Sequence, residues 1–362
     1  MPKSGTVTTS ARTHLTPYLT GGYVLLIIYA SLYPLAGWHD SGGHPLAFLG
    51  AAWPRYFTGF DLATNVAAYL PFGFFCTAAL RRRLAPQPAW LVAALLGGAL
   101  SFAMELFQNY LPSRVPSNLD LACNAAGALL GGLIGMRWGA RVLDEGRLAR
   151  WRRQVMMNAY GADMGVLLIA AWLMTQLSPE TLLFGSGDLR QMLELQAAQP
   201  FQPGRFVSLE AAIAAAGLLA AGLIATLLLR RHARLLTAGL LLAALLIKTL
   251  AHALLMGPTA AVAWITPGNS AGLAIGLGLW WGASFLVFPL QRAVAALALL
   301  FATVMVNIAP ENPYLLNSLH IWNPGQFLNF NGLTRLICSL WPFLALPWLM
   351  IYRPEHKNAP DH

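Results

Sequence analysis

Charged residues are scarce in this chain. Only 10% of its 362 residues are Asp, Glu, Lys or Arg, whereas 57% are hydrophobic. A soluble domain usually carries about a quarter charged residues. This composition therefore argues against a soluble protein and predicts an all-α, polytopic helical bundle in a membrane. Membrane topology explains the net charge of +9 better than nucleic-acid binding, and we expect no nucleic-acid partner.

Motifs of common catalytic and metal sites are also missing. The sequence contains no Walker A motif, no His-Glu-x-x-His motif and no dinucleotide-binding fingerprint. Its three cysteines, Cys76, Cys123 and Cys338, lie in apolar segments without the spacing of metal ligands. We therefore expect no metal, no cofactor and no disulfide.

Long apolar runs, by contrast, are frequent. A transmembrane helix needs about 20 mostly apolar residues, and the sequence contains about ten such runs. They lie at roughly 18–37, 61–80, 89–111, 118–137, 160–177, 207–229, 235–256, 270–288, 291–309 and 334–352. Most of the 23 Lys and Arg residues fall on one side of these spans. The positive-inside rule then predicts a multi-pass membrane protein with both termini cytoplasmic.

A basic segment from Arg137 to Arg153 divides the spans into two groups. Residues 1–155 form a predicted four-helix membrane module. Residues 156–362 form a second membrane module of about six helices, in which no known domain is recognised.

Two spans begin with the same polar pair. Asp61 and Asn65 open one span, and Asp120 and Asn124 open another. An Asp and an Asn four residues apart share one helix face. A carboxylate is costly in a bilayer and is a functional-site candidate by default. The repeated pattern predicts either a structural repeat or two similarly capped helix starts.

A second group of polar residues lies between these pairs, in the segment Glu105–Asp120. Its members are Glu105, Gln108, Arg114 and Ser117. The topology places all of them near the outer face, so we expect them to join both Asp–Asn pairs in one outward-facing site. Arg114 is expected to neutralise one of the acids.

Helix capping is the alternative explanation. Asp near a helix N-terminus satisfies free backbone N–H groups and complements the helix dipole. Capping accounts for Asp61 and Asp120 but not for Asn65, Asn124 or Glu105. Polar contacts that only hold helices together remain a second alternative.

The second module contains its own polar pair. Lys248 and His252 lie one helical turn apart within a span. They are either a coupling pair, such as a proton relay, or a carbonyl-bonded Lys beside a packed His. The segment 189–196 is a candidate interfacial helix, and the loop 309–332 is either a headgroup site or an aromatic interface belt.

Glycines spaced four residues apart recur in several spans. This spacing predicts close helix packing, at Gly127, Gly131 and Gly135, at Gly272 and Gly276, and at Gly278 and Gly282.

The ordered set of motifs resembles the VanZ-like family of bacterial membrane proteins. The resemblance covers roughly residues 18–140 and rests on Asp61, Asn65, Tyr69, Pro71, Gly73, Glu105, Gln108, Arg114, Ser117, Asp120, Asn124 and Gly127. It implies a cell-envelope context, because the family's namesake is associated with low-level resistance to the glycopeptide teicoplanin. It implies no reaction, since the family's biochemical mechanism is not established. This chain departs from the short family form by its additional spans.

Three classes of function are compatible with these residues. The first is binding or handling of an envelope lipid or glycan, such as a lipid-linked precursor or a glycopeptide-like ligand, through charge-assisted hydrogen bonds. The second is a transporter or flippase that uses Lys248 and His252 for coupling. The third is a membrane hydrolase or transferase with Glu105 or Asp120 as general base. The sequence determines neither the ligand nor the oligomeric state.

Overall fold

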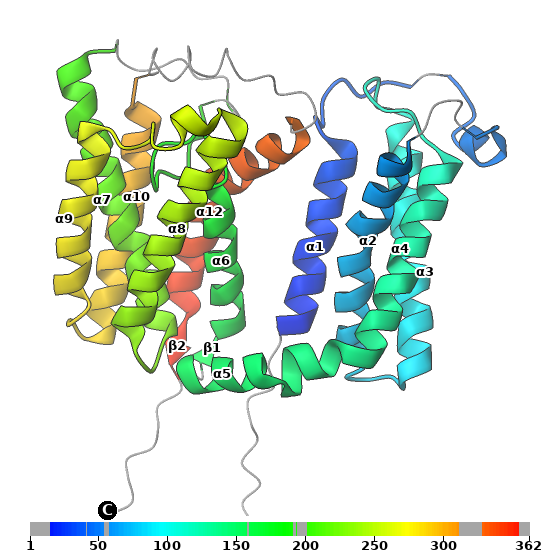
Figure 1. The fold of residues 1–362 in the computed structure, drawn as a ribbon, viewed down its shortest axis with the longest axis horizontal. Coiled ribbons are helices and arrows are strands. Elements are labelled where there is room, and N and C mark those ends of the chain that lie inside the picture. Colours follow the sequence, from blue (N-terminus) through cyan, green and yellow to red (C-terminus); the bar gives the residue numbers. More distant parts are fainter. Residues whose placement is uncertain are drawn as a thin grey trace, which may run out of the picture. The chain divides into compact units, whose positions relative to one another are not determined.

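A computed structural model describes residues 15–40, 42–53, 58–157, 159–190, 193, 201–310 and 328–354. The chain divides into two compact units, an N-terminal unit (Met1–Arg152) and a C-terminal unit (Arg153–His362). The division falls within helix α5 (Arg147–Val155), and the boundary expected from the sequence, between residues 155 and 156, lies at the end of this helix. Both units are built from helices (Figure 1).

Each of the expected membrane spans contains a helix. Eight helices within the described ranges are long and apolar enough to cross a membrane. They are α1 (Leu15–Leu32), α2 (Gly59–Leu80), α3 (Pro86–Gln108), α4 (Asn118–Ala140), α7 (Pro203–Leu228), α8 (Ala233–Leu255), α10 (Phe288–Ile308) and α12 (Leu328–Ile351). The remaining two spans correspond to α6 (Ala162–Thr175) and α9 (Pro267–Ala283), which have 14 and 17 residues. The prediction of a polytopic helical membrane protein is confirmed.

The helices of the N-terminal unit begin at residues suited to helix starts. Pro86 occupies the first turn of α3, where its missing N–H removes no intrahelical hydrogen bond. The hydroxyl residues Thr58 and Ser117 are the N-caps of α2 and α4. These caps place the polar residues that follow them in the first turns of both helices.

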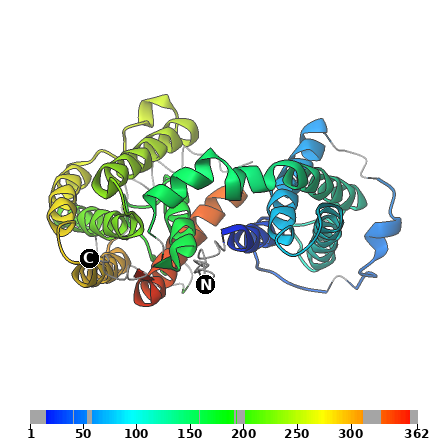
Figure 2. The ribbon, with the colours of Figure 1, turned by 90° about the horizontal axis from the view of Figure 1, so that it is seen from below.

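Close contact with α4 fixes the position of α2. A Cβ atom added at any of three α4 glycines would overlap a backbone carbonyl oxygen of α2. The overlapping pairs are Gly127 with Val66, Gly131 with Leu70, and Gly135 with Phe74. Both members of these pairs advance by one helical turn at each step, so the two helices run parallel. Figure 2 shows the helices of this unit, coloured blue to teal, nearly end-on.

The core of the C-terminal unit forms around α7. Every residue from Ile213 to Leu228 is buried. Helix α9 packs closely on α7, because a Cβ atom at Gly272 or Gly276 would press on the α7 backbone. The predicted packing role of Gly278 and Gly282 is wrong for the described residues, since no atom lies within 4 Å of a Cβ built there. Those two glycines lie on α9 faces that the described residues leave open.

Three short elements complete the described part of the C-terminal unit. Strands β1 (Ala159–Tyr160) and β2 (Arg353–Pro354) pair antiparallel, with Tyr160 opposite Arg353. A short 3-10 helix (Pro258–Ala260) follows α8. The N-terminal unit likewise has a 3-10 turn (Ala47–Gly50) and a π-helical turn (Arg141–Glu145) after α4.

Several expectations fall outside the described residues. They concern the termini at 1–14 and 355–362, most of the candidate interfacial helix at 189–196, and most of the loop at 309–332.

Substitution of Gly131 by Ala is expected to destabilise the N-terminal unit. The new methyl group would overlap the Leu70 carbonyl, and overpacking of this kind costs about 1–3 kcal/mol. The thermal midpoint of the purified protein in detergent measures the effect. Gly98→Ala is the matched control, because no atom lies within 4 Å of a Cβ at Gly98. Equal midpoints for the two variants would contradict the backbone contact.

Candidate functional site

The polar cluster lies where the first turns of α2 and α4 meet the end of α3. Asn65 Nδ2 donates to Asp120 Oδ1 at 2.7 Å, which joins the two Asp–Asn pairs directly. Asp120 also interacts electrostatically with both Asp61 and Glu105. The three carboxyl groups therefore belong to one local site, contributed by three helices.

Asp61 takes part in an N-terminal capping box. Its Oδ2 accepts hydrogen bonds from the Thr58 backbone N–H at 2.9 Å and from the Thr58 hydroxyl at 2.8 Å. The Thr58 Oγ1 in turn accepts from the Asp61 N–H at 3.2 Å. This reciprocal pattern satisfies two backbone donors that the helix leaves free. Capping therefore accounts for Asp61, whose side chain is exposed.

The start of α4 uses its acid differently. Ser117 Oγ accepts from the N–H groups of Leu119 and Asp120 at 3.2 and 3.3 Å. The Ser117 N–H, however, donates to Glu105 Oε2 at 2.8 Å. Glu105 thus occupies the capping position that Asp61 holds in α2. Asp120 is released from this role and accepts from Asn65 instead.

The interior end of the cluster contains polar atoms without partners. Asn124 Nδ2 donates to Ser101 Oγ at 2.9 Å, but the buried Asn124 Oδ1 accepts no hydrogen bond from the described residues. The Tyr69 hydroxyl lies near Ser101 and Glu105 yet makes no hydrogen bond of good geometry. Tyr69 is 3% exposed and Asn124 8%. An unpaired buried polar atom costs roughly 1–3 kcal/mol, so this pair of atoms requires an explanation.

Gln108 and Arg114 contact α1 rather than the acids. Gln108 Nε2 donates to the Ser31 carbonyl at 2.9 Å. The Arg114 guanidinium donates to the carbonyls of Tyr33, at 3.0 and 3.2 Å, and Ala30, at 3.1 Å. A cation at a helix C-terminus complements the dipole and satisfies carbonyls that lack intrahelical donors. The expectation that Arg114 neutralises an acid is therefore wrong, because its guanidinium binds backbone carbonyls at the end of α1. Partial burial at this position lowers the pKa of Arg114.

Tyr69 and Ser101 were not among the site residues expected from the sequence. The pattern that identifies them is the helical spacing of four residues. Tyr69 follows Asn65 by one turn on α2, and Ser101 precedes Glu105 by one turn on α3. Extending each polar pair by one more turn would have found both.

The C-terminal unit contains a buried acid that the sequence analysis did not single out. Glu210 on α7 is 5% exposed, and its Oε2 accepts from the Thr266 hydroxyl at 2.5 Å. Thr266 is also the N-cap of α9, where it accepts from the Asn269 N–H at 3.0 Å. The sequence signal that could have identified Glu210 is an isolated acid within an apolar span. As in the N-terminal unit, a buried Glu binds the residue that caps a neighbouring helix.

The ammonium group of Lys248 forms hydrogen bonds with two backbone carbonyls and one hydroxyl. Its Nζ donates to the carbonyls of Ser178 and Thr181 at 2.7 and 2.8 Å, and to the Thr181 hydroxyl at 3.3 Å. The side chain is 1% exposed. His252 Nδ1 lies 2.9 Å from the Lys248 carbonyl oxygen. These contacts correspond to the carbonyl-bonded alternative, in which the pair stabilises the turn after α6.

Within the described residues, no group of three His, Cys, Asp or Glu side chains is placed to hold a metal ion. The cluster in the N-terminal unit offers hydrogen-bond acceptors above all. A carboxylate can accept several hydrogen bonds, and Asn124 Oδ1 has no donor among the described residues.

The fold defines a polytopic helical membrane protein, and its N-terminal unit has a distinctive cluster of acids and amides. Residues 18–139 match the family model described as VanZ/LLP1. This match confirms, over the N-terminal region, the resemblance to the VanZ-like family seen in the sequence. A search of curated proteins gave no match, and neither did a search of solved structures.

Replacing Lys248 by Met is expected to destabilise the C-terminal unit. The Ser178 and Thr181 carbonyls would lose their donor, which costs about 1–3 kcal/mol for each group left unpaired. Thermal unfolding in detergent measures the loss. Leu246→Met, at a position 55% exposed on the same helix, is the control and should leave the midpoint unchanged. A Lys248→Met protein as stable as the control would show that these hydrogen bonds contribute little.

Proposed function

We propose that the N-terminal unit of this VanZ-like membrane protein binds an amine- or hydroxyl-bearing group of an envelope lipid or glycan. The binding residues are Tyr69, Glu105, Asp120 and Asn124. The observation that carries the proposal is a pair of buried polar atoms, Asn124 Oδ1 and the Tyr69 hydroxyl, that make no hydrogen bond of good geometry with the described residues.

The balance of donors and acceptors supports a ligand rich in donors. Glu105 and Asp120 each receive one hydrogen bond from the protein, although a carboxylate accepts several. No basic side chain forms an ion pair with either acid in the described part of the chain. An ammonium or hydroxyl group would supply the missing donors through charge-assisted hydrogen bonds. A phosphate or carboxylate ligand would add further acceptors and like charge.

Exposure decreases along the cluster, which supports access from one end. Asp61 is exposed, Asp120 is half-buried, and Glu105 and Asn124 are buried. A ligand group entering from the helix ends would therefore meet acids first and the unpaired atoms last. At each depth, hydrogen bonds to the site would replace those that the group loses to water.

The positive-inside pattern of the sequence supports an outward-facing position of these helix ends, in the inner membrane that the family resemblance implies. An envelope lipid, a glycan or a lipid-linked precursor is the ligand class available there. The resemblance to the family's namesake suggests a second cellular measurement, the susceptibility of cells to teicoplanin. A coupling role for Lys248 is not part of the proposal, because its donors are already used by backbone carbonyls.

Glu105→Gln is expected to weaken ligand retention while leaving the fold intact. The amide oxygen can still accept from Ser117, but the negative charge is lost and an N–H donor takes the place of an acceptor. Mass spectrometry of envelope molecules that co-purify with the wild type and the variant measures binding. The species retained by the wild type should fall about tenfold or more, which corresponds to one charge-assisted hydrogen bond.

Asp40→Asn is the matched control, because Asp40 is an exposed carboxylate of the same unit that bonds the Gly42 N–H at 2.9 Å. This variant should retain the ligand like the wild type. Equal retention by Glu105→Gln at equal protein levels would leave the cluster a purely structural feature. A chemically altered envelope species that tracks the wild type would instead assign Glu105 or Asp120 to catalysis.

A further inference from the structure

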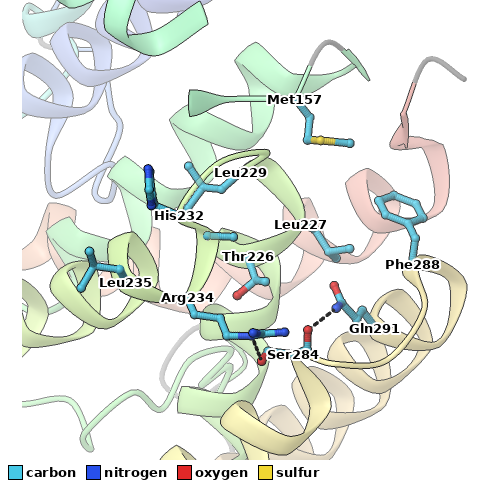
Figure 3. Close-up of a pocket in the computed structure, with 11 residues that line it drawn as sticks. Met157, Thr226, Leu227, Leu229, His232, Arg234, Leu235, Ser284, Phe288 and Gln291 are labelled. Carbon is cyan, nitrogen blue, oxygen red and sulfur yellow. Dashed lines mark hydrogen bonds between the residues drawn. The ribbon is translucent and has the colours of Figure 1, made fainter. Parts of the chain in front are cut away.

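A cavity of about 420 Å³ lies within the C-terminal unit, apart from the residues considered so far. It is formed by the end of α7, the start of α8, the residue that ends α9 and the first turn of α10 (Figure 3). Ligand sites in proteins commonly enclose about 300–1,000 Å³. The cavity is therefore large enough for a headgroup with part of the chain that bears it.

Arg234 is the only formally charged side chain among the lining residues when histidine is neutral. Its Nε donates to Ser284 Oγ at 2.9 Å, as the dashed line in Figure 3 shows. Its Cζ lies 3.6 Å from the centroid of the Phe285 ring. These two contacts hold the guanidinium plane in place. The terminal nitrogens have no acceptor among the described residues, so most of the five N–H donors of the group remain available.

The lining of the cavity contains no group that would neutralise Arg234. No Asp or Glu lines it. Gln291 Nε2 already donates to the Ser284 and Leu286 carbonyls at 3.0 and 2.9 Å. No acidic group within the lining therefore competes for Arg234, and the chemistry is the reverse of the acceptor-rich cluster in the N-terminal unit.

The start of α8 adds further N–H donors in support. His232, the N-cap residue, has a φ of 51° and makes no side-chain capping hydrogen bond. The three residues that follow it, Ala233 to Leu235, line the cavity. First-turn N–H groups have no intrahelical partner, and they favour an anion.

The opposite wall is apolar. Met157, Leu227, Leu229 and Phe288 supply it, and Figure 3 shows these side chains around the cavity. An inorganic anion alone would leave this wall in contact with water. A ligand that carries both an anionic group and a hydrocarbon segment matches both walls.

We propose that this cavity binds an anionic phospholipid, with its phosphate on Arg234 and the adjoining glycerol and acyl segment against the apolar wall. The positive-inside pattern predicts that this end of the bundle is cytoplasmic. Basic pockets between transmembrane helices on that side are suited to anionic headgroups. The proposal is independent of the ligand proposed for the N-terminal unit.

Native mass spectrometry of the full-length protein in detergent tests the assignment. The protein is titrated with phosphatidylglycerol or with phosphatidylcholine, which differ in net charge. The wild type should retain phosphatidylglycerol in preference, and Arg234→Gln should weaken that binding about tenfold or more. Arg234→Lys keeps the charge but not the planar donor array and should lie between them.

Arg205→Gln is the control, because it makes the same change of charge at an exposed position in the first turn of α7. It lies roughly 30 Å along the helix from Thr226, which lines the cavity, and should bind within about twofold of the wild type. Unfolding midpoints of all variants separate loss of binding from loss of fold.

Two results would overturn the proposal. One is equal binding of phosphatidylglycerol by the wild type and by a folded Arg234→Gln protein. The other is displacement of the lipid by inorganic phosphate at the same concentration, which would assign the cavity to free phosphate. Phosphate that fails to compete, together with selective loss in Arg234→Gln, supports the phospholipid.

Discussion

The direct backbone contact between α2 and α4 is the constraint on which the N-terminal unit depends. Without Cβ atoms at Gly127, Gly131 and Gly135, α4 approaches the α2 carbonyls closely enough for short side chains to meet across the interface. Asn65 reaches Asp120 only because the helices run parallel at this separation. The same approach brings the carboxyl groups of Asp61 on α2 and Asp120 on α4 near each other, and Glu105 joins them from α3 through the Ser117 N–H.

The two helix starts show how one neighbouring side chain changes the role of an acid. Each start has a hydroxyl N-cap followed three residues later by Asp. In α2 the acid completes its own capping box. In α4 Glu105 accepts from the N-cap N–H first, so Asp120 is available to a partner on another helix. A local sequence pattern therefore specifies where each helix begins, but tertiary contacts decide what its acid binds.

The sequence predicted the helical spans, the glycine packing at α2–α4 and most members of the polar cluster, because each follows from a short-range rule. The length of an apolar run predicts a membrane span, and the spacing of residues along a helix predicts which side chains share a face. The hydrogen-bond partners of side chains depend on contacts between distant segments, and these partners were not predicted correctly. Arg114 reaches the carbonyls of α1, which no spacing rule connects to it. The partner of Glu210, Thr266, could not be predicted either, because it lies 56 residues away at the start of another helix.

The glycine contacts also limit how the N-terminal unit can move. Helices that interlock at every turn cannot slide past each other smoothly, since the next allowed register is a full turn away. Helices α2 and α4 are therefore expected to move together as one rigid unit. Helix α1 is attached differently, because the long side chains of Gln108 and Arg114 hold its last carbonyls. Tyr23 of α1 also donates to the Ala68 carbonyl of α2 at 2.9 Å, so a shift of α1 would break side-chain hydrogen bonds but leave the α2–α4 backbone contact intact.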